Sequence, residues 1–384
     1  MKIAEQKHEK NKFGQYFTPD SVAEFMIEMA DFTTISSALE PSCGEGVFLK
    51  KLTTRGVKNI VAYEIDESLA NDFTGVRYSS FVTAQIEERF DLIIGNPPYI
   101  RWKNLEPNLK EELHTSLIWN TYFNSLCDYL YIFILKSIEL LNENGQLIFI
   151  CPEYWMNTTH SISLRNYMVS KGCFEQIYHF NETPIFEKVT ISTVIFKFTK
   201  GGTIDKKISV AKFNANQKLT IETLTKLKSK TDFNDVEYLE IPQFKLNERW
   251  VLQTEEVKDK LRILERNCVP ENSNTLLAIF NDVNLNYTTI GDVCTIGNGL
   301  VSGLDKAFQV NGHELNVNEL NATINVFKAK DLNPYITNNV TKYIYIKEEL
   351  TEEGFSTKYP NFYTHFQKYR TELENRYQYN RKIN

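Results

Sequence analysis

The sequence predicts an α/β protein whose mostly parallel sheet is followed by a second domain of mixed type. Short apolar runs bounded by turn residues alternate with segments that have apolar residues at helical spacing, and this alternation lasts to about residue 200. A tight turn, Cys43-Gly44-Glu45-Gly46, joins the first expected strand to a helix, as in nucleotide-binding βαβ units. After Gly201-Gly202 the alternation breaks down, which places the second domain in the rest of the chain.

The first part of the chain divides into strands and helices in a regular order. We expect strands at residues 37–40, 59–66, 76–81, 90–95, 146–151, 174–180 and 190–198, with one more at 206–213. We expect helices at residues 22–30, from 47 onward, and at 109–117, 128–142 and 161–170. The polar, lysine-rich stretch that runs to about residue 239 is typical of a linker.

Length, charge and cysteine spacing limit the classes of protein that fit. The 384 residues suggest two domains, and a hydrophobic content of 42% is enough for substantial cores. No apolar run reaches the ~18 residues of a membrane span, and the charged N-terminus lacks the apolar core of a signal peptide. The six cysteines show no paired spacing, which favours reduced thiols in a cytoplasm and argues against a zinc site. A net charge of −6 is unusual for a nucleic-acid-binding protein, although a local basic face would suffice.

The most informative stretch is the expected strand at residues 90–95 together with Asn96-Pro97-Pro98-Tyr99, which follows it. Ligands of open α/β sheets bind at the carboxyl ends of such strands. The amide oxygen of Asn96 and the carbonyl of Pro97 can accept the two N–H bonds of an exocyclic amino group, while Tyr99 stacks on the base that carries it. Both prolines keep the loop stiff. The alternative is an ordinary exit from a strand into a turn, where asparagine and proline are common.

The glycine turn carries acidic residues in place of the lysine of a phosphate loop. Glu40 and Glu45 would repel an anion, but they suit a cationic ligand that carries adenosine. Glu64 ends the second expected strand about twenty residues beyond the glycines, where an acidic side chain takes ribose hydroxyls. In this order, the elements predict a nucleoside-binding site.

Three further segments each have two interpretations. Residues 13–19 precede the first expected helix, which Thr18 or Asp20 would cap, and they either face a cofactor or only start the helix. Phe186 lies in a loop between two expected strands and either stacks on a base or packs in the core. Residues 101–103, an Arg-Trp-Lys sequence after the asparagine motif, either contact phosphates and an orphan base or form a solvated turn.

Taken together, these residues resemble those of the gamma-class adenine-N6 DNA methyltransferases. The resemblance is carried by Phe17-Thr18-Pro19 before a helix, the glycine turn, the acidic end of the second strand and Asn96-Pro97-Pro98-Tyr99, in this order. It extends from Phe13 to Phe198. The segment 297–308 also resembles part of the target-recognition domains of that family and of its restriction-enzyme relatives.

For the architecture, the resemblance implies a Rossmann-like, seven-stranded, mostly parallel sheet with an antiparallel last strand, which is the class I methyltransferase fold. It implies a catalytic domain over residues 1–235 and a mixed target-recognition domain over residues 236–384. The basic, aromatic segment 376–384 resembles the middle of a recognition domain in related chains. We therefore expect the recognition domain to be incomplete at Asn384.

By the same resemblance, S-adenosyl-L-methionine is the cofactor. Its pocket would be lined by Thr18, Glu40, Ser42, Gly44, Glu64 and Ile65 and closed by Asn96 and Pro98. At the end of the third strand, family members usually carry an aspartate that binds the cofactor's adenine amino group, followed by an aromatic residue. This chain aligns Ser80 and Phe81 there, so Phe81 can still stack on the adenine, but the serine is a poorer partner. The implied catalytic residues are Asn96, Pro97, Pro98, Tyr99 and Phe186.

The implied activity is site-specific methylation of N6 of an adenine that has been flipped out of the duplex, within a restriction-modification system. Tyr99 and Phe186 would sandwich the flipped base. The implied partners are double-stranded DNA and, where one accompanies this chain, a cognate restriction endonuclease; no membrane is expected, and the location is the cytoplasm, at the nucleoid.

Two alternatives to this activity stay open. Enzymes that methylate guanine N2 in RNA or glutamine N5 in proteins share the Asn96-Pro97-Pro98-Tyr99 motif, but they generally lack the large C-terminal domain. A specificity subunit could retain an inactive methyltransferase fold, but the intact Asn96, Tyr99 and Glu64 argue against it.

Overall fold

The computed structural model describes residues 16–69, 73, 75–186, 191–202, 205–213, 219–266, 302–310, 315–328 and 340–374. The chain forms two compact units, Met1–Asp282 and Val283–Asn384. Among the described residues, no helix has the length and apolar character needed to cross a membrane.

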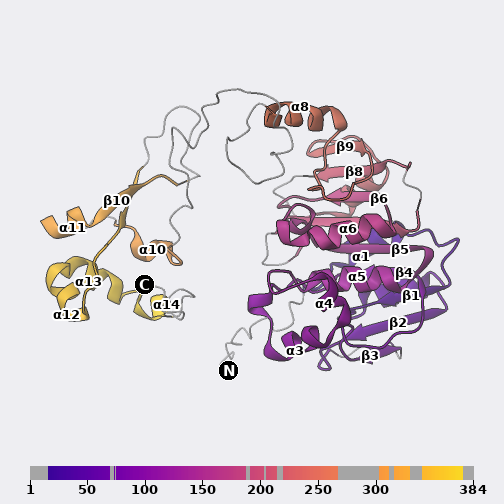
Figure 1. Ribbon diagram of the computed structural model, residues 1–384, viewed down its shortest axis with the longest axis horizontal. Coiled ribbons are helices and arrows are strands. Elements are labelled where there is room, and N and C mark those ends of the chain that lie inside the picture. Colours follow the sequence, from indigo (N-terminus) through magenta and orange to yellow (C-terminus); the bar gives the residue numbers. More distant parts are fainter. Residues whose placement is uncertain are drawn as a thin grey trace. The chain divides into compact units, whose positions relative to one another are not determined.

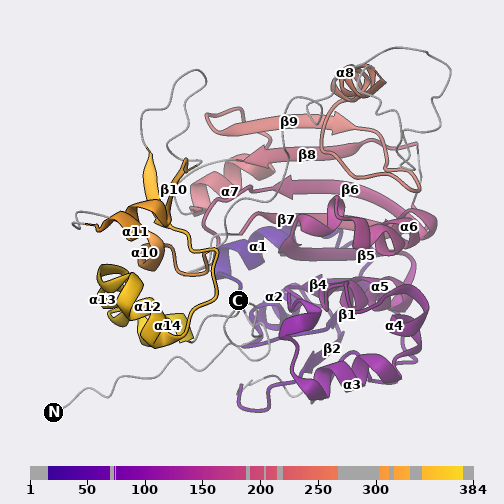
Figure 2. The same ribbon diagram turned by 60° about the vertical axis from the view of Figure 1, so that its left-hand side comes forward.

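A nine-stranded sheet, counted over the described residues, is the centre of the first unit (Figure 1). Its strands are β1 (Ser37–Glu40), β2 (Asn59–Glu64), β3 (Val76–Tyr78), β4 (Phe90–Gly95), β5 (Leu141–Pro152), β6 (Gly172–His179), β7 (Thr193–Lys200), β8 (Ile208–Phe213) and β9 (Val236–Ile241). They lie in the order β3-β2-β1-β4-β5-β7-β6-β8-β9, which can be followed from β2 to β9 in Figure 2, while β3 is labelled in Figure 1. The strands β3, β2, β1, β4 and β5 pair in parallel with one another, and β7 is antiparallel to both β5 and β6.

This topology confirms the predicted mostly parallel sheet with an antiparallel seventh strand. Two strands extend it beyond the expected seven. The additional strand expected at 206–213 is present as β8, which runs parallel to β6. β9 runs antiparallel to β8, pairing Val236 with Phe213 and Ile241 with Ile208. It lies in the stretch whose composition indicated a linker.

The first unit extends further along the chain than the expected boundary at residue 235. β9 begins at Val236 and is hydrogen-bonded into the same sheet as β1, the strand that leads into the predicted cofactor loop. Beyond it, Trp250 stacks on Phe244 with ring centroids 4.4 Å apart and packs edge-on against Trp155, which is buried in the core. The compact unit, which is bounded at Asp282, therefore continues beyond residue 235, because residues 236–252 complete the sheet and its core.

Helices cover both faces of the sheet (Figures 1 and 2). One face packs against α1 (Asp20–Glu28), α2 (Val47–Thr54) and α7 (Ile221–Lys228), and the other against α3 (Pro107–Thr115), α4 (Leu117–Tyr122), α5 (Leu130–Leu140) and α6 (Ile162–Lys171). Alternate residues of β4 explain this layering, because Leu92 and Ile94 join the first layer and Ile93 joins the second. A strand that is apolar on both faces is buried only between two covering layers.

Helix α7 was not expected from the sequence. The hydroxyl of Thr220 starts it by accepting a hydrogen bond from the amide of Thr223. Leu224 and Leu227 are buried in the same apolar cluster as α1. The lysine-rich composition of this stretch therefore belongs partly to the exposed face of a packed helix, while α8 (Glu255–Arg266) follows later in the chain.

The second unit combines short helices with a two-stranded antiparallel sheet, as far as its described residues go. Its elements are α10 (Asp305–Phe308), α11 (Val317–Asn321), β10 (Thr323–Val326), β11 (Thr341–Ile344), α12 (Glu352–Lys358), α13 (Pro360–Gln367) and α14 (Arg370–Glu374). The buried carboxylate of Glu319 joins two of them, because it accepts hydrogen bonds from the amides of Asn316 and Asn361. Residues 13–15, 297–301 and 375–384, to which the sequence analysis referred, lie outside the described residues.

Candidate active site

The carboxyl ends of three neighbouring strands meet at one edge of the sheet. Glu40 ends β1, Glu64 ends β2 and Gly95 ends β4, and β1 pairs in parallel with both of the others. Parallel neighbours bring their carboxyl ends together, and ligands of open α/β sheets bind there. The acidic residues and the asparagine motif, which are more than thirty positions apart in the sequence, therefore face one region of space.

Glu64 shapes the glycine turn. One of its carboxylate oxygens accepts a hydrogen bond from the amide of Gly44 at 2.8 Å, and the other accepts from the amides of Ile65 and Asp66 at 3.0 and 2.9 Å. Gly44 and Gly46 have φ angles of +51° and +75°, in the left-handed region that favours glycine. The turn is thus fixed by charge-assisted hydrogen bonds in the protein alone.

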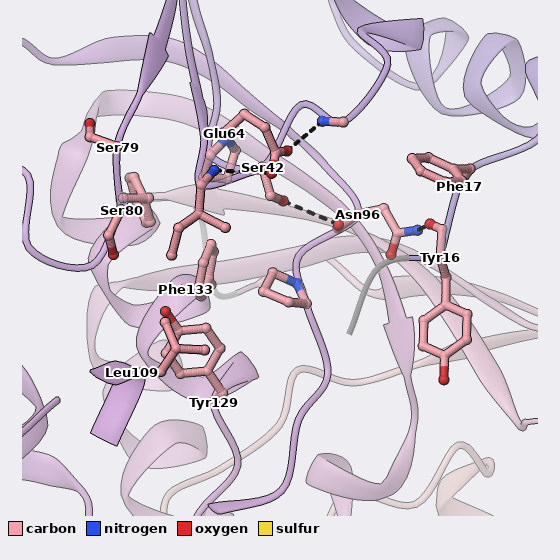
Figure 3. A pocket seen from close by; sticks show the side chains of 15 residues that line it. Tyr16, Phe17, Ser42, Glu64, Ser79, Ser80, Asn96, Leu109, Tyr129 and Phe133 are labelled. Carbon is pink, nitrogen blue, oxygen red and sulfur yellow. Dashed lines mark hydrogen bonds between the residues drawn. The ribbon is translucent and has the colours of Figure 1, made fainter. Parts of the chain in front are cut away.

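Beside this turn lies a cavity of about 630 Å³, shown in Figure 3. The predicted cofactor residues that line it are Ser42, Gly44, Glu64, Ile65, Ser80, Phe81, Asn96 and Pro98. Further lining residues, which the sequence analysis did not single out as members of the site, are Tyr16, Phe17, Pro41, Ser79, Leu109, Tyr129 and Phe133.

Thr18 and Glu40, the other predicted cofactor residues, line an adjoining cavity of about 360 Å³ that shares Phe17 and Gly44 with the first. Glu40 is only 1% exposed, and no described group donates a hydrogen bond to its Oε2. Burial, with the charge of Glu64 as a second cause, raises the pKa of Glu40 well above its usual range. A buried carboxyl oxygen without a donor is suited to a cationic ligand, because a positive charge would restore the ionised form.

Asn96 is held at both ends of its side-chain amide. Its Nδ2 donates a hydrogen bond to the backbone carbonyl of Tyr16 at 2.6 Å, and its Oδ1 accepts one from the hydroxyl of Tyr99. The Ser42 hydroxyl donates to the Asn96 backbone carbonyl at 3.2 Å (Figure 3). Burial raises the pKa of Tyr99 well above its usual range, so its phenol remains a donor at neutral pH. These bonds orient the amide, whereas Pro97 is buried and does not line the cavity.

Three aromatic rings gather beside this amide. The rings of Tyr16 and Tyr99 are stacked, with centroids 5.4 Å apart and an interplanar angle of 10°. The centroid of the Phe186 ring lies 5.9 Å from that of Tyr16 and 6.5 Å from that of Tyr99, and the ring is tilted against both. The structure therefore brings the two predicted base-stacking residues together, but the ring that lies flat on Tyr99 is that of Tyr16. Phe186 is buried and also belongs to the apolar core.

Comparison with known proteins identifies the family. The model of the Eco57I restriction-modification methylase family matches residues 22–186. The chain is 40% identical to the type II methyltransferase M.HindII of Haemophilus influenzae over 375 residues, which cover 97% of this chain and 70% of that protein. It is 38% identical to M.HincII, also a type II methyltransferase of Haemophilus influenzae, over 97% of this chain and 69% of that protein. The chain belongs to the restriction-modification methyltransferases.

Among solved structures, a type I restriction-modification system methyltransferase subunit from Streptococcus thermophilus is similar, with a TM-score of 0.45 and 18% sequence identity. The similarity covers 59% of this methyltransferase and 56% of that chain.

In this restriction-modification methyltransferase, the end of the third strand has an unexpected set of contacts. β3 stops at Tyr78, so the chain has already left the sheet where Ser80 and Phe81 line the cavity. The Ser80 hydroxyl donates a hydrogen bond to Oε2 of Glu112, on α3, at 2.6 Å. Phe81 is 2% exposed and packs against Phe133, with ring centroids 5.2 Å apart. The Ser80 hydroxyl is thus paired with the carboxylate of Glu112, which belongs to a different element, α3.

The residues that follow the asparagine motif do not share one environment. Trp102 stacks on Trp119 of α4, with centroids 5.6 Å apart and an interplanar angle of 17°. It therefore packs within the methyltransferase and is half-buried. Arg101 and Lys103 are exposed, and phosphate contact stays a prediction for these two residues alone.

The cavity residues that the sequence analysis did not single out fall into two groups. Tyr16 and Phe17 directly precede the predicted Thr18, so their position in the motif was a usable signal. Leu109, Tyr129 and Phe133 come from α3 and α5 or the turn before it, and these elements lie in the chain between β4 and β5. Their apolar spacing predicts only a packed helix, and nothing local marks the residues that face a ligand.

Proposed function

We propose that this methyltransferase transfers the methyl group of S-adenosyl-L-methionine to N6 of an adenine that is flipped out of double-stranded DNA. The observation that carries the proposal is the fixed Asn96 amide beside the cavity, with Tyr99 and Phe186 next to it. An amide oxygen and aromatic faces are the groups that bind an amino-bearing base outside a duplex.

The lining residues fit S-adenosyl-L-methionine by the chemistry of their donors and acceptors. The unpartnered Oε2 of Glu40 suits the positive end of the cofactor. Glu64 accepts three backbone hydrogen bonds and retains acceptor capacity for ribose hydroxyls, because a carboxylate offers about four lone-pair sites. Ile65 and Phe81 provide apolar surface for an adenine ring. When bound, this cofactor supplies a methyl carbon made electrophilic by a positively charged sulfur.

The chain contributes to the reaction chiefly by holding the nucleophile. The lone pair of an adenine amino group is delocalised into the ring, which makes it a weak nucleophile. Acceptors at Asn96 Oδ1 and at the Pro97 carbonyl would bind its N–H bonds more strongly as the nitrogen becomes tetrahedral, and so favour the transition state. As the nitrogen–methyl bond forms and the carbon–sulfur bond breaks, the nitrogen passes its surplus proton to solvent. Positioning of the two reactants accounts for the remainder of the acceleration.

We assign the reading of the DNA target to the second unit. It carries an open cavity of about 810 Å³ whose lining includes Asn318, Asn321, Tyr345 and Lys347. Amide side chains pair with adenine edges in the major groove, and ammonium groups bind phosphates. Lys347→Ala should then weaken DNA binding for all sequences and reduce the salt dependence, whereas Asn321→Ala should relax sequence preference.

The decisive experiment uses duplex DNA with methyl-labelled S-adenosyl-L-methionine, followed by nuclease digestion and mass spectrometry of the nucleosides. We expect the label in N6-methyl-2′-deoxyadenosine, and only from duplexes that contain one recognition sequence. Label in a cytosine would refute the adenine assignment, and label only in RNA or protein would refute the DNA assignment.

A further inference from the structure

The inner wall of the larger cavity is apolar except at one corner. Phe81, Leu109 and Phe133 line it together, and all three are buried or face the core. The buried polar groups beside them are the hydroxyl of Ser80, which is 9% exposed, and that of Tyr129, which is 3% exposed and hydrogen-bonds to Ser80. A flat apolar slot with a polar group at its edge is suited to an aromatic heterocycle that carries one polar substituent.

The direction of the hydrogen bond at this corner determines which substituent fits. A serine hydroxyl has one proton and two lone pairs. Ser80 gives its proton to Glu112 Oε2 at 2.6 Å, so its oxygen accepts from the Tyr129 hydroxyl with one lone pair and can offer a ligand only the other. A carboxylate acceptor also polarises the hydroxyl, which makes its oxygen a stronger acceptor. The corner therefore accepts hydrogen bonds from a ligand and does not donate them.

The placement of Glu112 follows from the packing of α3. Leu109 and Leu113 are buried, and Leu109 itself lines the cavity. Glu112 lies three residues after Leu109 and so shares its face of the helix, whereas Glu111 is exposed. The Glu112 carboxylate lies 2.6 Å from the hydroxyl of Ser80, a residue of the cavity lining, which places it at the cavity wall.

The neighbouring backbone is held in place by a buried lysine. Lys136 Nζ on α5 donates to the carbonyls of Phe81, Val82 and Ala84 at 2.6, 3.0 and 2.7 Å. The same ammonium group lies 5.0 Å from the centroid of the Phe81 ring. The turn that presents Ser80 is therefore fixed on the side away from the ligand, and the acceptor is positioned before a ligand arrives.

We infer that Glu112, acting through Ser80, selects a purine with an exocyclic amino group in this cavity and so positions the adenine of the methyl donor. This inference rests on the proposed function, which supplies the adenine-bearing cofactor. Glu112 is thus a positioning residue. The end of the third strand supplies only the Ser80 hydroxyl, and the carboxylate that orients this hydroxyl comes from α3. A hypoxanthine ring has a carbonyl in place of the amino group. Its carbonyl oxygen and the Ser80 oxygen would then face each other as two acceptors with no proton between them.

The experiment measures the affinities of the full chain for S-adenosylhomocysteine and S-inosylhomocysteine by calorimetry. A hydrogen bond to a neutral hydroxyl is worth about a few-fold to tenfold in affinity, so we expect the wild type to prefer the adenine ligand by about that factor. Glu112→Gln should bring the two affinities close together, chiefly by weakening the adenine ligand. Glu111→Gln, the same charge change on the exposed face of the helix, should keep the wild-type preference.

A rescue variant separates recognition from folding. In Ser80→Asp combined with Glu112→Gln, the carboxylate moves onto the residue that lines the cavity, and the adenine preference should return. Unchanged preference in Glu112→Gln overturns the inference, and so does an equal loss of both ligands, which would mean a structural role. If the wild type methylates DNA but does not distinguish the two ligands, this inference fails and the proposed function stands. If the wild type binds neither ligand, the proposed function fails first.

Discussion

The two halves of the site differ in how far the protein alone prepares them. On the cofactor side lies a cavity. The Glu64 carboxylate there is held by backbone amides, and Oε2 of Glu40 has no hydrogen-bond donor among the described residues. On the base side, the ring of Tyr16 covers Tyr99, and the Asn96 amide is bonded at both ends. The difference teaches that the cofactor side presents its acceptors without a bound ligand, whereas a base that stacks on this face of Tyr99 must displace a side chain.

The largest effect is expected at Asn96, where the two halves meet. Asn96→Ala removes the acceptor for the amino group, and loss of one such hydrogen bond costs about 3 kcal/mol, or roughly a hundredfold in kcat. Cofactor affinity should fall much less, because the substituted group acts mainly in the transition state. Single-turnover methylation and calorimetry measure the two quantities. Asn59→Ala, at the exposed amino end of β2, is the matched control, and near-wild-type turnover of Asn96→Ala would refute the mechanism.

Glu64→Ala tests whether the cofactor side depends on its carboxylate. The variant loses the acceptor of the Gly44 amide as well as the predicted ribose contact, and hydrogen bonds to charged groups are worth about 1.5–3 kcal/mol. We expect affinity for S-adenosyl-L-methionine to fall by about tenfold or more in calorimetry. The exposed Glu67 lies three residues further on, and Glu67→Ala should bind as the wild type does. Equal affinity of Glu64→Ala and wild type would show that this carboxylate does not serve the cofactor.

Tyr99→Ala and Phe186→Ala test the base side. Stacking of one base on an aromatic ring is worth ~1–3 kcal/mol, so each variant should capture the flipped base less well. The fluorescence of 2-aminopurine at the target position reports base extrusion, and single-turnover rates report its consequence. Phe186 is buried in the apolar core, so thermal unfolding of Phe186→Ala must be measured alongside. If its fluorescence and rate equal those of the wild type, Phe186 only packs.

The raised pKa of Glu40 predicts a pH dependence on the cofactor side. In the free protein, burial keeps the carboxyl group protonated above its ordinary titration range, and a bound positive charge would release that proton. Affinity should therefore rise with pH from about 4.5 up to the pKa of the free protein, by at most about tenfold per unit. Calorimetry in buffers of different ionisation enthalpy counts the protons released. Glu40→Gln should lose this component while it retains the titration of the ligand's own amino group; identical slopes would contradict the prediction.

The smallest effect is expected at Tyr16. A stacked aromatic pair is worth about 0.5–1.5 kcal/mol, so Tyr16→Ala should favour capture of the target base by a few-fold. The same 2-aminopurine experiment measures this change, with an increase in fluorescence amplitude as the expected result. Phe17→Ala is the control, because Phe17 lines both cavities, whereas the ring stacked on Tyr99 is that of Tyr16. A lower amplitude would mean that Tyr16 forms a wall of the base site and does not merely occupy it.

The sequence alone determined the parts of this methyltransferase that depend on short-range patterns. Apolar runs with turn residues at their ends predicted the parallel strands, because a strand buried on both faces needs no polar alternation. The residues Gly44, Glu64 and Asn96 were predicted as one site because the order of their motifs resembles that of the adenine-N6 methyltransferases. Both arguments use only short motifs and their order along the chain.

The tertiary structure alone decided the contacts between residues that lie far apart in the sequence, because no local pattern around either residue indicates its partner. Glu112 is an ordinary charged residue on a helix, and only the packing of α3 brings it to Ser80. Tyr16 covers Tyr99 because the segment before α1 crosses the end of β4, 80 positions away, where its carbonyl accepts a hydrogen bond from Asn96. β9 escaped prediction because a polar edge strand has a composition like that of a linker, and only its pairing with β8 distinguishes it. Side-chain contacts of this kind depend on how whole layers pack, and no local period in the sequence encodes them.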